Sequence, residues 1–312
     1  MVYNDLMKLY FTLWIILFML DTNAKTVAII DMPISRNYLS PQLSKKVQKI
    51  YNMSNPAETF KNCDGIVENF EKFFSYSLLG QYDKLNSLKY LNQFESFAYQ
   101  IHGYHILGLV AHNTNHQIYF IGVNPPISKK YLRKIDQYIN TDLEEEFIFI
   151  KKHLIKIKPD FVNISGSKSI DDNLFFLKEN KINDITAMKY SNRIFKKWSM
   201  FWKQLISSLP NTTFVVSAGN GGSDWQSDKV EFNSISIKAT TPANIKLDNI
   251  IVVGSKHLGK LSPFSSYGEV VDAYENGEKV ISYIPCGTKN TLRLTGTSQA
   301  TAIRTNRLLR AK

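Results

Sequence analysis

Short apolar runs alternate along this chain with longer stretches in which apolar residues recur at a helical spacing. The runs are rich in β-branched residues and nearly free of charge, which is typical of strands buried on both faces of a parallel sheet. We therefore predict one α/β domain, with a mostly parallel sheet and helices on both of its faces. The runs occupy residues 26–30, 118–121, 160–165, 213–217 and 250–254.

Two of the intervening stretches have the periodicity of amphipathic helices. In residues 128–158 the apolar side chains recur every three or four positions, and the stretch ends at Pro159. A similar stretch at about 190–208 ends before Pro210. This spacing places the apolar side chains on one face, so both stretches are predicted to pack on the sheet. A further helix is expected to begin at His102.

The N-terminus has the pattern of a signal peptide. Lys8 precedes the apolar run Leu9–Leu20, which is shorter than the roughly 20 residues that a membrane-spanning helix needs. Small and polar residues follow up to Ala24, so cleavage is expected before Lys25. Residues 1–24 are thus predicted to direct export and to be removed, the alternatives being an uncleaved anchor or a buried helix.

Charge and cysteine content narrow the functional classes only slightly. The formal net charge is +11, but the lysines are scattered and form no aromatic-interleaved basic patch, so no nucleic-acid partner is indicated. The two cysteines, Cys63 and Cys286, would both lie in the exported part. The sequence is compatible with a disulfide between these cysteines and equally with two buried free thiols.

Four polar residues lie where a predicted strand ends or a predicted helix begins, the edge at which open α/β sheets place their sites. They are Asp31 after VAII, His102 in HGYH, Asn220 in SAGN and Ser298 in GTSQA. Each has an ordinary alternative as a helix cap or turn residue when taken alone. Their occurrence together, in the order Asp, His, Ser, favours a catalytic triad.

These segments resemble motifs of the subtilase family of serine proteases, and they follow one another in the family's order. The resemblance implies a subtilisin-like three-layer fold over residues 25–312. Residues at about 36–100 are polar, aromatic-rich and irregular, so we expect an insertion there that carries one or two helices, such as 64–75. The matching segments are VAIID, HGYHILGLVA, DFVNIS, VVSAGNGG, IIVVGS with the later SPFSSYG, and GTSQA, between residues 26 and about 305.

The resemblance also implies roles for the four residues. Ser298 would attack the peptide carbonyl to form an acyl-enzyme, His102 would take and later return its proton, and Asp31 would orient the imidazole. Asn220 and the Ser298 backbone N–H would stabilise the oxyanion. Substrate backbone would pair with Ser165, Gly166 and Ser167.

The expected protein is thus a secreted or periplasmic serine endopeptidase, a monomer that acts on polypeptides. It would meet a membrane only during export, and no cofactor or nucleic acid is expected. Subtilases often bind structural calcium, for which the sequence assigns no ligands. His105, His112 and His116 lack the companions of a zinc site, so we expect them in the core or on the surface. Arg304, Arg307 and Arg310 are expected on a solvated helix face.

Departures from the family pattern leave a second hypothesis open. Met32 and Pro33 follow the catalytic Asp where the family has Ser or Thr and then Gly, so a hydroxyl that could support the carboxylate is missing. After Ser298 the family's Met-Ala-Ser-Pro is replaced by QATA. Most exported subtilases carry a pro-region that assists folding, but few residues separate Lys25 from Asp31. We therefore expect this chain to fold either without such a segment or with a helper in trans. A catalytically weak or silent subtilase fold that binds peptides or a partner protein is the alternative.

Overall fold

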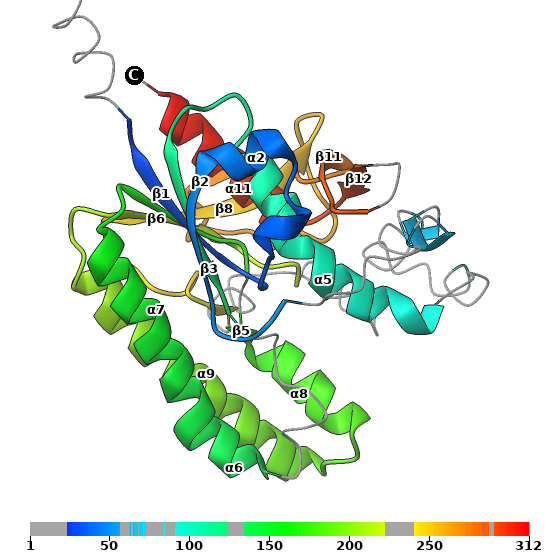
Figure 1. The fold of residues 1–312 in the computed structure, drawn as a ribbon. Helices are drawn as coiled ribbons and strands as arrows, with labels where there is room; N and C mark the ends of the chain where they lie inside the picture. The colour runs from blue at the N-terminus through cyan, green and yellow to red at the C-terminus, as the bar shows by residue number, and fades with distance from the viewer. Residues whose placement is uncertain are drawn as a thin grey trace, which may run out of the picture.

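The chain folds around one twisted, mostly parallel sheet with helices on both faces (Figure 1). A computed structural model describes residues 24–56, 63, 65–67, 69–70, 72, 84, 91–123, 134–166, 168–221, 240–286 and 290–311. In the sheet, the strand order is β10-β8-β6-β4-β1-β3-β2, and every neighbouring pair on this path is parallel. Its strands are β1 (Thr26–Asp31), β2 (Val47–Asn52), β3 (Gln117–Gly122), β4 (Phe161–Ile164), β6 (Thr213–Ser217), β8 (Ile250–His257) and β10 (Ala273–Glu275).

Alternate residues of the central strands pack into two different cores. Ala28 and Ile30 of β1 contact the helices on one face, whereas Val27 and Ile29 contact those on the other. All four side chains are buried, and burial of a valine or isoleucine side chain contributes about 1.5–3 kcal/mol. The predicted parallel sheet with two covered faces is confirmed.

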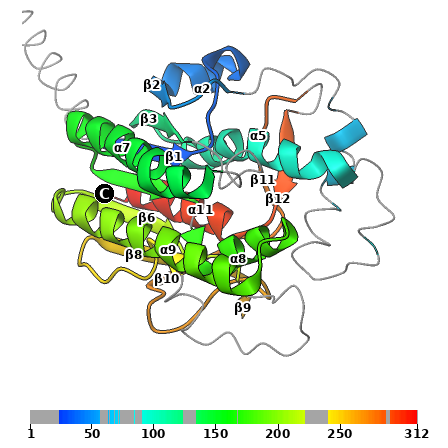
Figure 2. The same cartoon turned by 90° about the horizontal axis from the view of Figure 1, so that it is seen from below.

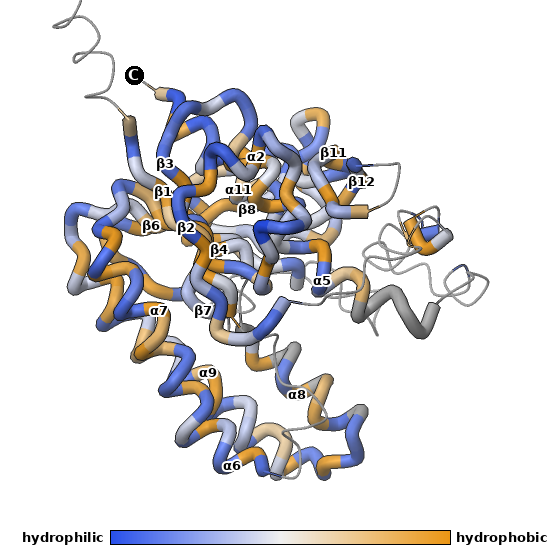
Figure 3. Tube along the Cα trace, in the orientation of Figure 1, coloured by the Kyte–Doolittle hydropathy of each residue, from blue (hydrophilic) through white to orange (hydrophobic). Residues whose placement is uncertain are grey.

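Helices α7 (Leu143–Ile157), α8 (Ile170–Glu179) and α9 (Asp184–Ser207) lie on one face of the sheet, and α5 (Leu91–Val110) and α11 (Thr297–Arg310) lie on the other (Figure 2). The α7 side chains Leu143, Phe147, Ile150 and Leu154 are buried at helical spacing. Figure 3 shows the resulting alternation of apolar and polar positions along α7 and α9. In the described part of the chain, no helix combines the length and apolar composition that crossing a membrane requires.

Shorter elements complete the described structure. A helical segment before α7 consists of α6 (Ile135–Gln137) and the π-helical η3 (Tyr138–Asp142). The antiparallel pairs are β8 with β9 (Lys260–Leu261), β5 (Lys168–Ser169) with β7 (Thr240–Thr241), and β11 (Val280–Tyr283) with β12 (Thr291–Leu294). Two short helices, η1 (Arg36–Tyr38) and α2 (Pro41–Lys46), precede β2.

In the segment that leads to the HGYH motif, the structure corrects one expectation and adds one strand. His102 does not begin a helix, because α5 begins at Leu91 and His102 lies in its middle. The proposed insertion at 36–100 also contributes β2, an edge strand paired with β3. Of the predicted helix at 64–75, the described residues 65–67, 69–70 and 72 are helical.

Two long-range links join distant parts of the chain. Cys63 and Cys286 form a disulfide with 5.9 Å between their Cα atoms and a sequence separation of 223, which resolves the choice between a bridge and free thiols. At the start of β1, the Lys25 Nζ donates to the carbonyl oxygens of Leu308 (3.1 Å) and Ala311 (2.6 Å). The start of β1 therefore lies beside the end of α11 (Figure 1).

Candidate active site

Asp31 and His102 are brought together by the close packing of β1 and α5. Asp31 is the last residue of β1 and is 5% exposed, and its Oδ1 lies 2.7 Å from His102 Nδ1. Gly103 permits this approach, since a Cβ there would collide with the Met32 carbonyl oxygen. The Met32 backbone N–H also donates to Asp31 Oδ1 at 2.7 Å. Among the described residues, nothing donates to the buried Asp31 Oδ2.

The ion pair with Asp31 sets the properties of His102. Burial lowers the pKa of the imidazole, but the negative charge and the hydrogen bond of Asp31 together raise it more, so the pKa lies above its usual value of 6.5. Because Nδ1–H donates to the carboxylate, Nε2 of the neutral ring carries the lone pair. The His102 side chain is 23% exposed at the cleft, so this nitrogen is available as a base.

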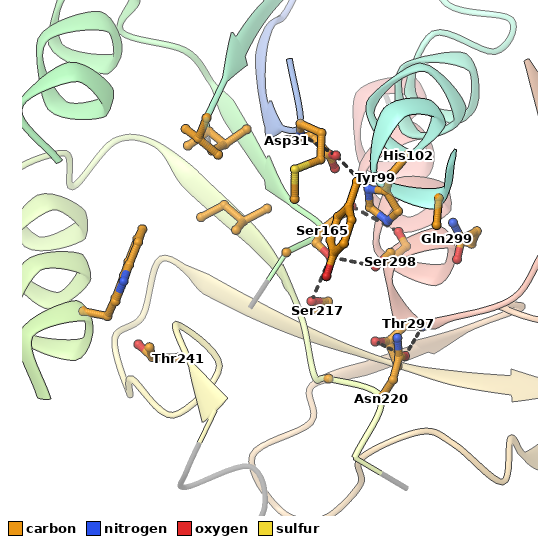
Figure 4. A pocket seen from close by; sticks show the side chains of 18 of the residues that line it. Asp31, Tyr99, His102, Ser165, Ser217, Asn220, Thr241, Thr297, Ser298 and Gln299 are labelled. Atoms are coloured by element: carbon orange, nitrogen blue, oxygen red, sulfur yellow. Dashed lines mark hydrogen bonds and ion pairs between the residues drawn. The ribbon is translucent and has the colours of Figure 1, made fainter. Parts of the chain in front are cut away.

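Ser298 is the second residue of α11, at the helix N-terminus that faces the cleft. Its Oγ donates to the Ser165 carbonyl oxygen at 2.7 Å. Between these described residues, no hydrogen bond joins Ser298 Oγ to His102. The serine hydroxyl and the imidazole thus line the same cleft (Figure 4), but in this state the hydroxyl is held by the end of β4.

Asn220 is fixed against the first turn of α11. Its side-chain Oδ1 accepts from both the backbone N–H and the hydroxyl of Thr297, each at 2.8 Å. The amide Nδ2 is therefore left as the group that can donate into the cleft. Gly296 makes room for this arrangement, because a Cβ there would lie 3.3 Å from Asn220 Nδ2 and 2.9 Å from the Gln299 Oε1.

The end of β4 provides the predicted substrate-binding segment. Ser165 is buried, and its Oγ accepts from Asn163 Nδ2 (2.8 Å) and donates to the Ser298 carbonyl oxygen (3.1 Å). Gly166 is exposed, and a Cβ there would meet nothing within 4 Å, so its backbone is open to a ligand. Ser167, the third predicted contact, lies outside the described residues.

One cleft of about 410 Å³ contains all of these groups (Figure 4). It also contains residues that the sequence analysis did not single out. Tyr99 lies three positions before His102 on α5, and its ring extends over the cleft between His102 and Ser165. The i, i+3 spacing could have indicated this residue, had α5 been expected to begin before His102.

At its inner end the cleft reaches the helices on the other side of β1 and β4. The side chains there come from α7 and α9, and in each helix they are one turn apart. Their spacing is that of ordinary core positions, which is why the sequence pattern did not distinguish them. They are Glu146, Ile150, Trp198 and Trp202.

The remaining histidines have structural contacts. His105 is fully buried, with Nε2 3.1 Å from the carbonyl oxygens of both Val280 and Leu292. Burial lowers its pKa to about 3, so it is neutral and donates to these carbonyls. His116 Nε2 contacts the Leu309 carbonyl oxygen. Among the described residues, no group of three or more His, Cys, Asp or Glu side chains is placed to hold a metal ion.

The arginines of α11 lie on a largely exposed face, as expected, and two of them also pair with a buried carboxylate. Glu275 at the end of β10 is buried, and the guanidinium of Arg307 pairs with its Oε2. Arg304 lies 3.6 Å from the other carboxylate oxygen. The Arg307 side chain is still 64% exposed, and Arg310 is exposed as well. Two of the three arginines therefore hold the helix that carries Ser298 against the sheet.

Comparisons with known proteins identify the fold and the sequence family of this arrangement. The sequence model of the subtilase family matches residues 22–309. The solved structure of the patellamide maturation protease PatG superposes with a TM-score of 0.53 at 14% identity, covering 93% of this chain and 75% of that chain. A cold-adapted subtilisin-like serine proteinase is 16% identical, with a TM-score of 0.49 and coverage of 91% and 73%. The search of curated proteins found no match.

Proposed function

The chain belongs to the subtilase family, which supports serine-type peptidase activity, and we propose that it is an exported serine endopeptidase whose triad is Asp31, His102 and Ser298. The observation that carries the proposal is the 2.7 Å contact between Asp31 Oδ1 and His102 Nδ1, in a cleft that also contains Ser298 and Asn220. A carboxylate that orients an imidazole beside a hydroxyl is the arrangement that acyl transfer requires.

The first step is attack on a peptide carbonyl carbon by Ser298 Oγ. For this step the hydroxyl rotates away from the Ser165 carbonyl oxygen and donates to His102 Nε2, which takes the proton as the C–O bond forms. Asp31 keeps the Nδ1 proton in place and stabilises the imidazolium without being protonated. The raised pKa of His102 favours this proton transfer.

The negative charge that forms on the carbonyl oxygen is placed near two donors. Asn220 Nδ2 is directed by the two bonds that Thr297 makes to Oδ1, and the Ser298 backbone N–H belongs to the unsatisfied first turn of α11. His102 then protonates the leaving amine as the C–N bond breaks. A water molecule hydrolyses the ester by the same route and regenerates Ser298.

Two features favour the alternative of a weak or silent peptide-binding subtilase fold. Asp31 Oδ2 has no donor among the described residues, at a position where Met32 replaces a hydroxyl residue. Ser298 Oγ also donates to Ser165 rather than to the imidazole. Both features would weaken activation of the nucleophile.

The test is labelling of the protein from Lys25 onward with a fluorophosphonate probe. We expect labelling at Ser298 that is lost in Ser298→Ala and reduced in His102→Ala, while Ser207→Ala, an exposed position of α9, is labelled normally. Absence of labelling in a protein whose circular dichroism shows it to be folded would favour the binding function. Export is tested separately, since N-terminal sequencing of the secreted product should begin at Lys25.

A further inference from the structure

Ser165 and Ser298 are joined by two hydrogen bonds that run in opposite directions. The Ser298 Oγ donates to the Ser165 carbonyl oxygen at 2.7 Å, and the Ser165 Oγ donates to the Ser298 carbonyl oxygen at 3.1 Å. Both residues are buried. The hydroxyl that would attack the substrate is therefore held by the end of β4 and not by the imidazole of His102.

The backbone that carries the Ser165 carbonyl is fixed relative to α11. Asn163 Nδ2 donates to Ser165 Oγ at 2.8 Å, and Asn163 Oδ1 accepts from the hydroxyl of Thr305 at 2.9 Å. Asn163 and Thr305 are fully buried, and Thr305 lies two turns after Ser298 on the same helix. Because side-chain bonds tie β4 to both turns, rotation of the Ser298 side chain to another staggered position is the smallest change that frees its hydroxyl.

The Ser165 carbonyl oxygen already accepts from two hydroxyl groups. A carbonyl oxygen has two lone pairs, and Ser217 Oγ donates to this one at 3.4 Å beside the shorter bond from Ser298 (Figure 4). A further donor that enters from the cleft must replace one of these hydroxyls. Release of Ser298 is favoured, because its hydroxyl can then donate to the lone pair of His102 Nε2, which lines the same cleft.

One N–H of a bound peptide is placed to take over this acceptor. The carbonyl carbon must come within about 3–3.5 Å of Ser298 Oγ before attack, and that Oγ lies 2.7 Å from the Ser165 oxygen. The nitrogen of the leaving group must face His102, which protonates it. The nearest remaining N–H belongs to the residue that supplies the carbonyl, and its nitrogen is only two bonds from the attacked carbon.

We propose that the Ser165 carbonyl makes attack by Ser298 conditional on a backbone N–H in the substrate residue before the cleaved bond. This N–H replaces the serine hydroxyl on the carbonyl oxygen, and the released hydroxyl donates to His102. The inference rests on the proposed triad and narrows its substrate class. Simple acyl esters and peptides with proline before the cleaved bond lack the N–H and are poor substrates. The small fluorophosphonate probe also lacks it, so it labels Ser298 slowly.

The first experiment compares three peptide p-nitrophenyl esters that differ only in the residue before the cleaved ester bond. This residue is alanine, N-methylalanine, or lactate, in which an oxygen replaces the N–H. We expect the acylation rate at saturating ester, corrected for the reactivity of each ester with hydroxide, to be roughly 10- to 100-fold higher for alanine than for either analogue. The reason is that an analogue displaces the serine hydroxyl without satisfying the Ser165 carbonyl. Equal acylation rates for the three esters would overturn the proposal.

A thiol in place of the hydroxyl separates release of the nucleophile from simple binding of the N–H. A thiol is a weak hydrogen-bond donor, so in Ser298→Cys the Ser165 carbonyl should hold the nucleophile only loosely. We expect the ratio of the alanine rate to the lactate rate to fall below about fivefold in this variant. Ser207→Cys, at an exposed position of α9, should keep the wild-type ratio. A ratio that is the same in Ser298→Cys as in the wild type would show that the N–H only contributes to binding, and would overturn the proposal.

An NMR measurement separates this inference from the catalytic one. The ligand is the alanine peptide with an uncharged CH2–S link in place of the cleaved bond, so it binds without reacting, and its lactate analogue is the control. At saturation, the alanine ligand should shift the 15N resonance of His102 Nε2 more than the lactate ligand does, because Ser298 then donates to this nitrogen. In Ser298→Ala the two ligands should give the same shift.

The two proposals can therefore fail independently. If the protein hydrolyses none of the esters but shows the shift that depends on Ser298, the peptidase proposal fails and the release of the hydroxyl is supported. If it hydrolyses all three esters at the same rate, the release mechanism fails and the peptidase proposal stands. Equal shifts with both ligands in the wild type, or a difference that persists in Ser298→Ala, would also overturn the release mechanism.

Discussion

The carboxylate of Asp31 is held through only one of its two oxygens by the described residues. Its Oδ1 accepts two hydrogen bonds, from His102 and from the Met32 backbone, while Oδ2 is buried and has no donor among the described residues. A hydrogen bond to a charged group is worth about 1.5–3 kcal/mol, so the missing donor leaves the carboxylate less firmly held.

Restoring the hydroxyl should therefore improve catalysis. We expect Met32→Ser to raise kcat by roughly tenfold or less, because a serine hydroxyl at this position can donate to Asp31 Oδ2. Met32→Ala is the matched control, since it shortens the side chain equally without adding a donor. The measurement is the kcat of both variants with one peptide substrate under steady-state conditions. Equal kcat values for Met32→Ser and Met32→Ala would contradict a role for the added hydroxyl.

The pH dependence of activity should follow His102. The imidazole must be neutral to accept the serine proton, and its pKa is raised, so kcat/KM should fall as the pH decreases through a value above 6.5. In Asp31→Asn the charge that raises the pKa is gone, so the acid limb should move to lower pH. Turnover should also fall by about 10⁴-fold, the effect of this change in another Ser-His-Asp protease. An acid limb that does not move would exclude His102 as the titrating base.

Thr297 is expected to act through Asn220. Its hydroxyl and backbone N–H both donate to Asn220 Oδ1, so Thr297→Val removes one of the two bonds that orient the amide. We expect kcat to fall by about tenfold with little change in KM, against the roughly 100- to 1,000-fold loss expected for Asn220→Ala. Thr291→Val, at an exposed position of β12, serves as the control. A change in KM alone would indicate a role in substrate binding instead.

At the scale of helices and strands, the sequence predicted best those elements whose buried side chains recur at a regular spacing. The run 213–217 coincides with β6, and the helical period at 128–158 contains α7. The edge strand β2 was missed because its sequence VQKIYN exposes several side chains and has no continuous apolar run. The start of α5 at Leu91 was not predicted, because no recognisable N-cap residue precedes it. The prediction instead placed the start of the helix at His102, the first residue of the HGYH motif.

Part of the candidate site could likewise be predicted from the sequence, and part could not. Motif spacing identified Asp31, His102, Asn220 and Ser298, and the structure places all four around one cleft. The hydrogen bond from Ser298 Oγ to the Ser165 carbonyl oxygen depends on packing in the folded protein, which the spacing of motifs in the sequence does not reveal. The inner residues of α7 and α9 have the pattern of core positions, so only the shape of the cleft distinguishes them.

The disulfide is the element-level feature with the clearest energetic consequence. It ties the segment before α5 to the region after β11, across a sequence separation of 223. We expect Cys63→Ala combined with Cys286→Ala to lower the free energy of unfolding by about 2–5 kcal/mol, measured by denaturant titration. A reductant should destabilise the wild type to a similar extent and leave the double variant unchanged. Equal stability of the two proteins would show that the bridge constrains little of the unfolded chain.

At the scale of the whole molecule, one cleft is lined by residues from both helical layers. The face covered by α5 and α11 presents the proposed catalytic groups, while the face covered by α7 and α9 supplies the inner end of the cleft. The carboxyl ends of β1, β4 and β6 lie between the two layers and connect them.

The contact between Lys25 and the last turn of α11 brings together two positions that are 286 residues apart in the sequence. Lys25 Nζ reaches the carbonyl oxygen of Ala311, so a short flexible linker could join these positions without moving either element. New ends could be opened at the exposed Leu258–Gly259 turn between β8 and β9. A circular permutant of residues 25–311 should fold and behave in the labelling test as the unpermuted protein does, because the sheet is defined by packing and not by the order in which its strands are synthesised.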